Sequence, residues 1–244
     1  GQAVGPSIPP IYERWVERMA RRGLPVLRYD KRTTRPAARQ ADPRAITFLD
    51  FVRDAVAAGD VLRGRSGVDA DRLVLVGHSQ GGNVAPAAAT RLDGVVGVAS
   101  IAGSALAIDS LFVAQMEAGG ASGSCTVDRA RAQFDSLRAG QPVSDGLICG
   151  AGTTFWRQWI RHSQKADSVA AALGPPILAQ QGRADQNYPG NSLQQNLDAW
   201  HRIAQNGDAT VKTYEGVDHF FLEEGTTTTA DAPLDALVSW IRNR

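Results

Sequence analysis

The stretch Leu73-Val74-Leu75-Val76-Gly77-His78-Ser79-Gln80-Gly81-Gly82-Asn83 decides the fold of this chain. A run of apolar, β-favouring residues ends in Gly-His-Ser-Gln-Gly, and an alanine-rich segment of helical character follows. The pattern G-x-S-x-G between a strand and a helix predicts a sharp turn that holds Ser79 in a strained backbone conformation. Gly77 and Gly81 lack side chains, so we expect the strand and the helix to pass close together there. Ser79 Oγ would then project from the end of a sheet strand.

Length and composition are those of an ordinary globular protein. The 244 residues are enough for one large domain, and 43% of them are hydrophobic and 21% charged. The formal net charge of +1 gives no reason to expect a nucleic-acid partner. No stretch reaches the roughly 18 consecutive apolar residues that a membrane span needs. We therefore expect neither a nucleic-acid partner nor a membrane span.

Apolar runs and helical periodicities alternate along most of the chain. Periodic apolar positions predict helices, and short apolar runs bounded by turn residues predict buried strands. Strands that alternate with helices favour an α/β fold, in which a mostly parallel, doubly wound sheet carries helices on both faces. The expected helices span 9–22, 44–63, 79–91, 192–206 and 233–242, and the expected strands span 24–29, 72–76, 95–101, 177–181 and 210–214.

Residues 105–173 break this alternation, because they contain no convincing strand and indicate helices and loops inserted between two strands. We expect residues 1–104 and 174–244 to form the core and the insert to form a helical cap over the pocket. Most aromatic side chains of the insert would form its own small core, and a few would face the cleft. The candidates for substrate contact are Phe155, Trp156 and Trp159 in the insert and Tyr188 outside it.

Cys125 and Cys149 are the only cysteines, and they lie 24 positions apart within the insert. They could form one disulfide, which would imply an oxidising compartment, or stay as two thiols that pack as small hydrophobes. Glycine or serine adjoins each of them, Ser124 before Cys125 and Gly150 after Cys149, which indicates exposed loops and favours the disulfide. On that basis we expect a secreted or periplasmic protein.

A serine hydroxyl becomes a nucleophile only with a base within hydrogen-bonding reach, and that base needs a carboxylate to orient it. The chain has four histidines. His78 adjoins the serine and is expected to pack or to support the site, His162 is expected at the surface of the insert, and His201 lies within a predicted helix. His219 follows the last predicted strand, at the edge of the sheet where sites of open α/β proteins gather. His219 is therefore the candidate base.

Asp185 is the candidate for the orienting carboxylate, because it follows the strand before the one that leads to His219. The order Ser79, Asp185, His219 is the order expected of a hydrolase built on a G-x-S-x-G turn. Two other acids compete with it. Asp218 adjoins His219, and adjacent side chains seldom orient each other, while Asp208 precedes a strand and so belongs to the wrong edge of the sheet.

Three stretches carry a resemblance to a known family: Arg22-Gly23-Leu24-Pro25-Val26-Leu27-Arg28-Tyr29-Asp30-Lys31-Arg32, Gly77-His78-Ser79-Gln80-Gly81-Gly82, and the pair Gln181-Gly182-Arg183-Ala184-Asp185 and Gly216-Val217-Asp218-His219. They resemble the α/β-hydrolase superfamily and, within it, the dienelactone-hydrolase-like and acyl-esterase branch. The likeness covers most of residues 9–104 and 175–244, and the insert resembles a family cap only in its place. It implies the α/β-hydrolase fold with Ser79 as nucleophile, His219 as base and Asp185 as the orienting acid.

The chain departs from this family at its start. The family has strands before its first helix, and the last of them is central in the sheet and ends in a His-Gly-type loop that supplies an oxyanion donor. Only Gly1–Ser7 precede the first predicted helix. We therefore expect N-terminal strands to be missing from this chain and an additional N-terminal chain or segment to complete the sheet. The N–H of Gln80, at a helix N-terminus, is the expected first oxyanion donor, and Val4 or a neighbour is the expected second.

These residues predict a serine hydrolase that cleaves a carboxylic ester, or a related acyl compound, through an acyl-enzyme. The substrate would be a small-molecule or polymeric ester, and the reaction needs neither a metal nor an organic cofactor. A peptidase or amidase, or an acyltransferase, would use the same triad, and the fold does not separate these reactions. A non-catalytic binding protein on a hydrolase scaffold is the alternative of another class, favoured by the shortened start and opposed by the retained serine, acid and base.

Overall fold

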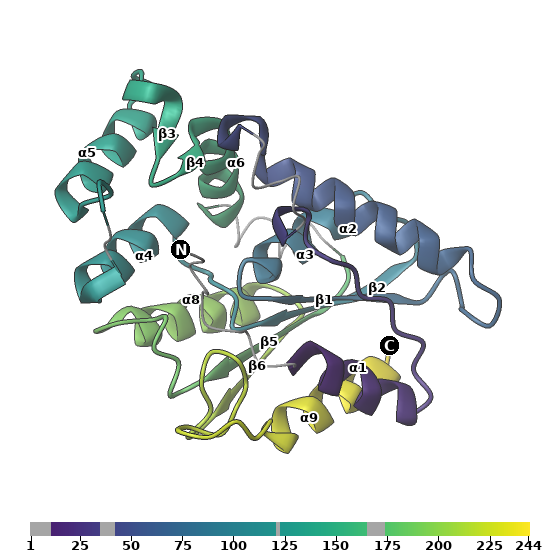
Figure 1. Ribbon diagram of the computed structural model, residues 1–244. Helices are drawn as coiled ribbons and strands as arrows, with labels where there is room; N and C mark the ends of the chain where they lie inside the picture. The colour runs from purple at the N-terminus through teal and green to yellow at the C-terminus, as the bar shows by residue number, and fades with distance from the viewer. Residues whose placement is uncertain (1–10, 35–41, 121–122, 165–173) are drawn as a thin grey trace, which may run out of the picture.

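A four-stranded parallel sheet forms the centre of the molecule (Figure 1). The computed structural model describes residues 11–34, 42–120, 123–164 and 174–244. The strands lie in the order β1-β2-β5-β6, and all neighbours are parallel, so their carboxyl ends meet at one edge. Their bounds are β1 Leu73–His78, β2 Val95–Ile101, β5 Ile177–Gly182 and β6 Ala209–Tyr214.

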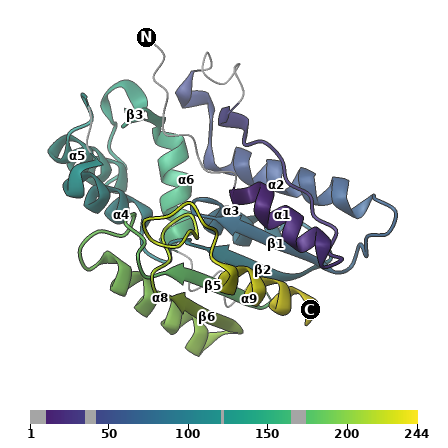
Figure 2. The same cartoon turned by 60° about the horizontal axis from the view of Figure 1, so that its bottom comes forward.

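Helices cover both faces of the sheet (Figures 1 and 2). Successive side chains of a strand point to opposite faces. Ala99 and Leu178 accordingly pack under α1 and α9, whereas Val98 and Ala179 pack under α3 and α8. Helix α2 lies against α3, and the result is the predicted doubly wound α/β sheet. The helices are α1 Ile11–Arg21, α2 Phe48–Arg63, α3 Gly81–Ala89, α8 Ser192–Asn206 and α9 Asp231–Arg242.

The segment between β2 and β5 forms a helical layer of its own (Figure 2). Its main helices are α4 Ile108–Gln115, α5 Val127–Arg138 and α6 Thr153–Gln164. It also contains a short antiparallel pair, β3 Leu147–Ile148 with β4 Ala151–Gly152, so the prediction of no strand here is wrong. Two residues are too few for an alternating pattern to be visible in sequence. The described residues also contain short helical turns: η1 Arg32–Thr34, η3 Pro43–Ala45, η4 Met116–Gly120 and η5 Ser144–Gly146.

A disulfide joins Cys125 to Cys149, whose Cα atoms are 5.1 Å apart. It connects the loop before α5 to the turn between β3 and β4, and so agrees with the predicted pairing of the two cysteines. The partly buried cysteines pack beside the core that α2, α3 and the insert share. The insert is therefore one packed unit, held by a covalent link in addition to its aromatic core.

The expected strand at residues 24–29 is not formed. This stretch has no regular secondary structure and pairs with no strand of the described residues. Leu24 and Val26 still pack beside the core under α1 and α9, but Tyr29 is 48% exposed. An apolar run becomes a strand only where a neighbour offers a hydrogen-bonding edge, and the pattern of one segment contains no information about its neighbour.

The second helix begins four residues later than predicted. The carboxylate of Asp50 accepts hydrogen bonds from the N–H and the hydroxyl of Thr47, both at 2.8 Å. This arrangement satisfies donors at the helix start and makes Phe48 the first residue of α2. The residues Pro43–Ala45 form a separate turn instead.

Strand β1 lies at one edge of the sheet, with β2 on its inner side. The N–H groups of Leu73 and Ser79 point toward β2, where they donate to carbonyls. Because alternate residues of a strand direct their N–H groups to opposite sides, those of Val74, Val76 and His78 point outward. The Val76 side chain is 40% exposed although it lies in the middle of the strand. Within the described residues, the outer edge of the strand that leads to Ser79 is therefore open.

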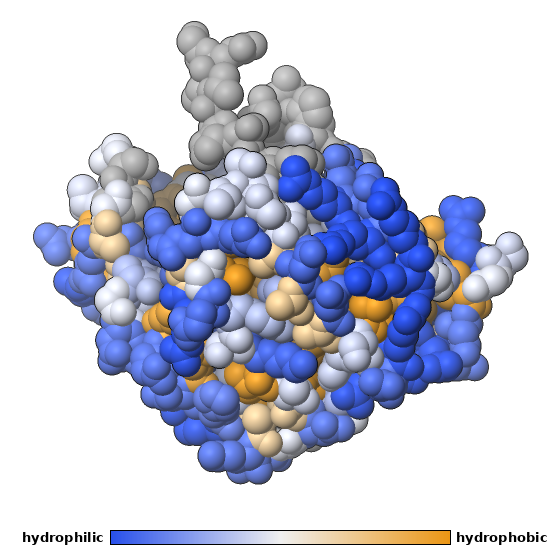
Figure 3. Space-filling model, turned by 90° about the horizontal axis from the view of Figure 1, so that it is seen from below, coloured by the Kyte–Doolittle hydropathy of each residue, from blue (hydrophilic) through white to orange (hydrophobic). Residues whose placement is uncertain are grey.

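The face formed by α1 and α9 is largely hydrophilic, with apolar patches between the charged side chains (Figure 3). Across it, Arg18 of α1 pairs with Asp231 of α9, and Arg22, just after α1, pairs with Asp235 of α9. None of the helices in the described ranges combines the length and the apolar character needed to cross a bilayer.

Candidate active site

The turn after β1 presents Ser79 at the carboxyl edge of the sheet. Its φ of 55° lies in the left-handed region, which non-glycine residues rarely adopt. A Cβ on Gly77 would lie 1.9 Å from the carbonyl oxygen of Gly81, and one on Gly82 would lie 2.5 Å from Ser100 Oγ. A Cβ on Gly81 would meet nothing within 4 Å, so the expectation for that residue is wrong. The contact of helix with sheet depends on Gly77 and Gly82 instead.

Three side chains from separate strand ends meet above this edge. His219 Nε2 lies 3.0 Å from Ser79 Oγ, and His219 Nδ1 lies 2.9 and 3.0 Å from the two carboxylate oxygens of Asp185. Asp185 and His219 are both buried. A carboxylate can only accept here, so Nδ1 carries the proton and Nε2 is left as the acceptor for the Ser79 hydroxyl. This array can move a proton from serine to imidazole while the carboxylate holds the ring.

Two further donors hold the carboxylate of Asp185. Gln181 Nε2 donates to Oδ2 at 2.7 Å, and the N–H of Asn187 donates to Oδ1 at 2.9 Å. The carbonyl oxygen of the Gln181 side chain is in turn 3.3 Å from Asn196 Nδ2 on α8. Sequence reasoning missed Gln181. The available signal was a pair of amides, Gln180 and Gln181, in an otherwise apolar strand, the second of them four residues before the acid.

The competing acids have other tasks. Asp218 Oδ1 accepts the N–H groups of Phe220 and Leu222 at 2.9 and 2.8 Å, so its carboxylate shapes the loop that carries His219. Asp208 lies at the amino end of the sheet, where its backbone carbonyl accepts the N–H of Ile177. Neither carboxylate orients the imidazole of His219.

The other histidines differ in their surroundings. His162 is partly buried, with its ring centroid 5.2 Å from that of Phe48, so its expected place at the surface is wrong. It follows the buried side of α6 rather than the polar residues beside it in sequence. His201 is exposed on α8. His78 lies under the site, and its Nε2 is 2.8 Å from the backbone carbonyl of His219.

The N–H of Gln80 is placed to bind a developing negative charge. It lies at the N-terminus of α3, where unpaired N–H groups and the helix dipole favour an anion. No described residue accepts a hydrogen bond from it. The side chain of Gln80 accepts from Lys31 Nζ, which also lies 4.9 Å from the centre of the Phe51 ring. Burial lowers the pKa of Lys31. Val4, the expected second donor, lies outside the described residues.

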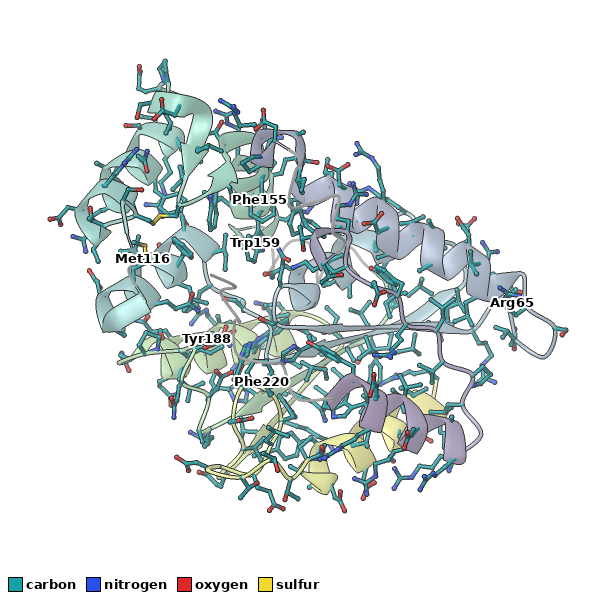
Figure 4. All side chains as sticks on the ribbon, in the orientation of Figure 1. Arg65, Met116, Phe155, Trp159, Tyr188 and Phe220 are labelled. Carbon is teal, nitrogen blue, oxygen red and sulfur yellow. A yellow bond between two sulfur atoms is a disulfide. The ribbon has the colours of Figure 1, made fainter. Side chains whose placement is uncertain are left out.

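A cavity of about 160 Å³ opens beside Ser79 and His219. Figure 4 shows Trp159 on the sheet side of α6 and Tyr188 near the end of the sheet. Burial raises the pKa of Tyr188, whose hydroxyl donates to the carbonyl of Ala102 at 3.2 Å. The insert lines the cavity with mostly apolar side chains, namely Ile108, Leu111, Phe112, Trp159 and the amide of Gln115. The core lines it with mostly polar residues, namely Gln80, Asn83, Ser104, Asn187, Tyr188 and the small Ala102.

Phe155 and Trp156 do not line this cavity, contrary to expectation. Phe155 packs edge-on against Phe51, with centroids 6.2 Å apart, and Trp156 packs against Phe134 at 5.0 Å. The indole N–H of Trp156 donates to the carbonyl of Ile148. Phe155 lies about one helical turn before Trp159, farther from the sheet (Figure 4). Both rings belong to the core that the insert shares with α2 and α3, and periodicity alone does not distinguish such a position from a cleft-facing one.

Two hydrogen bonds fasten the insert to the core on either side of the cavity. Trp159 Nε1 donates to Asn83 Oδ1 at 3.0 Å, which connects α6 to the helix that follows Ser79. Gln115 Nε2 donates to the carbonyl of Asn187 at 2.7 Å, which connects α4 to the loop that carries Asp185. The insert therefore contacts two of the three segments that position the site, those that carry Ser79 and Asp185.

Comparisons with known proteins agree with this architecture. Residues 7–236 match the alpha/beta hydrolase family, and no curated protein matches the sequence. A solved structure from work on LipS and LipT, two metagenome-derived lipolytic enzymes, is 19% identical with a TM-score of 0.57, covering 97% of this chain and 89% of its own. The monoacylglycerol lipase of Paleococcus ferrophilus is 20% identical with a TM-score of 0.48, covering 79% of this chain and 75% of its own. Since the family match spans most of its length, this chain belongs to the alpha/beta hydrolase family.

Proposed function

We propose that this protein is a serine hydrolase that cleaves carboxylic esters through an acyl-enzyme. The observation that carries the proposal is the position of His219, within 3.0 Å of Ser79 Oγ on one side and 2.9 Å of Asp185 on the other. Membership of the alpha/beta hydrolase family supports it, as does the fold shared with lipolytic enzymes.

The first half of the reaction forms the acyl-enzyme. Ser79 Oγ attacks the carbonyl carbon of the ester as His219 Nε2 takes its proton. Asp185 holds the Nδ1–H and stabilises the imidazolium that forms. The carbonyl oxygen becomes an oxyanion, to which Gln80 donates its backbone N–H, and the segment around Val4 supplies the second donor. His219 then gives the proton to the leaving alcohol, and the bond between carbon and alcohol oxygen breaks.

The second half releases the acid. A water molecule attacks the acyl carbon while His219 accepts one of its protons. The same donors stabilise the second oxyanion. When that intermediate collapses, the bond to Ser79 Oγ breaks, His219 returns the proton to the serine, and the carboxylic acid leaves. No redox step or additional co-reactant enters this cycle.

The cavity favours an ester with a compact acyl group. A void of about 150 Å³ lined by apolar side chains holds a molecule the size of benzene, and this cavity is about 160 Å³. Ile108, Leu111 and Phe112 give the insert side an apolar wall. In this proposal residues 105–173 act as a cap on the core of 1–104 and 174–244, and they set the length of the acyl group.

The disulfide indicates where the protein works. Structural disulfides persist in oxidising compartments and are rare in the cytosol. The bond between Cys125 and Cys149 therefore supports a secreted or periplasmic location.

The open edge of β1 supports an additional strand in the working protein. The N–H and C=O groups of Val74, Val76 and His78 have no backbone partner among the described residues, and they form a template that an extended segment can pair with. A segment in that place would cover Val76 and approach the oxyanion site from the side opposite β2. We expect it to come from further N-terminal chain.

Matched ester, amide and thioester probes with the same acetyl or butyryl group test the proposed function. We expect the p-nitrophenyl esters to be hydrolysed to acid and alcohol, with short acyl chains preferred to lauroyl. The Ser79→Ala variant should lose turnover by a factor on the order of 10⁴ or more. Preference for the amide would indicate a peptidase or amidase, and acyl transfer to an added alcohol would indicate an acyltransferase. Tight probe binding without turnover would leave a binding protein.

A further inference from the structure

His78 connects the first helix of the chain to the loop that carries His219. Its Nε2 lies 2.8 Å from the backbone carbonyl of His219, and its Nδ1 lies 2.8 Å from the hydroxyl of Tyr12 on α1. The rings of His78 and His219 are 4.9 Å apart, and the ring of Tyr12 meets His78 edge-on at 5.7 Å. Two nitrogens of one side chain thus join segments that are far apart in sequence.

The chemistry of the partners sets the direction of both hydrogen bonds. A backbone carbonyl can only accept, so Nε2 of His78 carries a proton and donates to His219. Burial, together with the charge that His219 can carry, lowers the pKa of His78 to about 4, so the ring is neutral at pH 7. Its Nδ1 is then an acceptor, and the Tyr12 hydroxyl donates to it. Burial raises the pKa of Tyr12, which keeps that hydroxyl protonated.

The carbonyl of His219 has this one partner among the described residues. The N–H of Phe220 belongs to the same peptide unit and donates to Asp218, which also accepts the N–H of Leu222. The peptide unit that follows the base is therefore held at its carbonyl by His78 and at its N–H by Asp218. Small displacements of a catalytic group are costly, and about 1 Å is enough to lower a rate by 10²-fold.

We propose that Tyr12 and His78 form a positioning relay that holds the backbone of His219, and so keeps its imidazole between Ser79 and Asp185. The inference rests on the proposed function, because it assigns the relay to the base of that reaction. It extends the site beyond the three strand ends to α1. The neutral histidine holds the loop without placing a second positive charge beside the imidazolium that forms during catalysis.

Three variants separate positioning from packing. His78→Leu removes both hydrogen bonds, His78→Gln retains an amide donor where Nε2 lies, and Tyr12→Phe removes only the hydroxyl. We expect His78→Leu to lower kcat about tenfold with KM changed less than about twofold, since an interaction that serves only the reacting geometry appears in kcat. His78→Gln should restore most of the loss. Tyr29→Phe, at another half-exposed tyrosine outside the relay, is the matched control and should leave kcat unchanged.

Coupling between the two residues gives a second criterion. If the hydroxyl acts through His78, Tyr12→Phe should lower kcat about threefold in the wild type and have no effect in His78→Leu. The relay is overturned if His78→Leu folds with an unchanged kcat, or if it raises KM instead of lowering kcat. It is also overturned if His78→Gln folds without restoring kcat, or if the effects of Tyr12→Phe and His78→Leu on kcat are additive.

A spectroscopic measurement tests the relay independently of turnover. The ¹⁵N spectrum of the histidine rings at pH 7 should report the Nε2–H tautomer for His78, with an Nδ1 resonance that moves in Tyr12→Phe. The Nδ1–H tautomer, or an Nδ1 resonance indifferent to Tyr12, would contradict it. If the wild-type protein turned over no ester, the proposed function would fail, and this spectrum would still decide the hydrogen-bonding relay.

Discussion

The two sides of Ser79 are built differently. Toward β5 and β6, the base and its acid are buried, and three donors converge on the carboxylate of Asp185. Away from them, β1 has an open edge in the described part of the chain, and Val76 is 40% exposed. In the proposed reaction, proton transfer belongs to the closed half of the site, whereas Gln80 is the one oxyanion donor proposed among the described residues.

The energies expected on the two sides differ accordingly. Removing a member of a serine triad costs a factor on the order of 10⁴, and one oxyanion donor is worth about 10²–10³. A substitution of a proposed catalytic residue on the closed side should therefore lower kcat strongly. A substitution on the open edge of β1 should change the free energy of unfolding only slightly. The predictions below are ordered by the size of the expected effect.

The largest effect should follow from Asp185→Asn. The neutral amide cannot stabilise the imidazolium by charge, and its NH₂ group can donate to Nδ1 and so favour the wrong tautomer of His219. We therefore expect kcat for a short p-nitrophenyl ester to fall by a factor on the order of 10⁴. Asp208→Asn, at the other edge of the sheet, is the matched control and should behave as wild type. A loss below about tenfold in Asp185→Asn, at an unchanged melting temperature, would mean that the closed half does not drive the reaction.

The second effect concerns His78, which joins the two sides. Its pKa in the folded protein is lowered from 6.5 to about 4, so between those values the unfolded chain binds more protons than the folded one. His78 therefore contributes about 3 kcal/mol to the free energy of unfolding above pH 6.5, and this contribution is lost as the pH falls toward 4. Urea unfolding at pH 4.5 and 7 should show a larger difference for wild type than for His78→Gln. If the change between pH 4.5 and 7 were equal in the two proteins, His78 would be exposed to water in the folded state and its pKa would not be lowered there.

Gln181→Leu should have a smaller effect on the same closed half. It removes the Nε2 donor to Asp185 while keeping a similar volume, and we expect kcat to fall about tenfold. Gln180→Leu is the matched control on the same strand, because that amide bonds to the Tyr214 hydroxyl and the Pro233 carbonyl instead. Both variants should lose stability, but only the first should lose kcat. If Gln181→Leu and Gln180→Leu had similar kcat values, Gln181 would have no part in holding Asp185 for the reaction.

The smallest effect is expected on the open side. Val76→Thr should cost less than about 0.5 kcal/mol in the free energy of unfolding, since the side chain is half exposed. The same change at Val98, which is fully buried on β2, should cost about 1–3 kcal/mol because it buries a hydroxyl. Chemical denaturation of the two variants checks this. Equal costs would show that β1 is covered in solution.

Much of the closed half could be predicted from sequence because its signals are local. The apolar runs at 95–101 and 177–181 became central strands, and the loops after strands carry the serine, acid and base. Turn chemistry, strand length and chain order are properties of short segments. They are sufficient to place three side chains at one edge of a parallel sheet.

The errors arose where the outcome depends on a distant partner. The run 24–29 looks like a strand but has no strand beside it in the described residues. Phe155 and Trp156 share a helix with Trp159, and only the packing of α2 and α5 decides which ring faces the cavity. Gln181 was missed because a neutral amide gives no sign of which carboxylate it will meet. Each of these depends on tertiary contacts that no single segment encodes.

Reaction with a fluorophosphonate, followed by intact-mass and peptide analysis, tests the central proposal most directly. In the wild-type protein we expect one adduct on Ser79, and in His219→Ala we expect that adduct to be lost, because the hydroxyl no longer has a base 3.0 Å away. An unmodified wild-type protein, an adduct on another residue, or equal labelling of His219→Ala would contradict the proposed hydrolase.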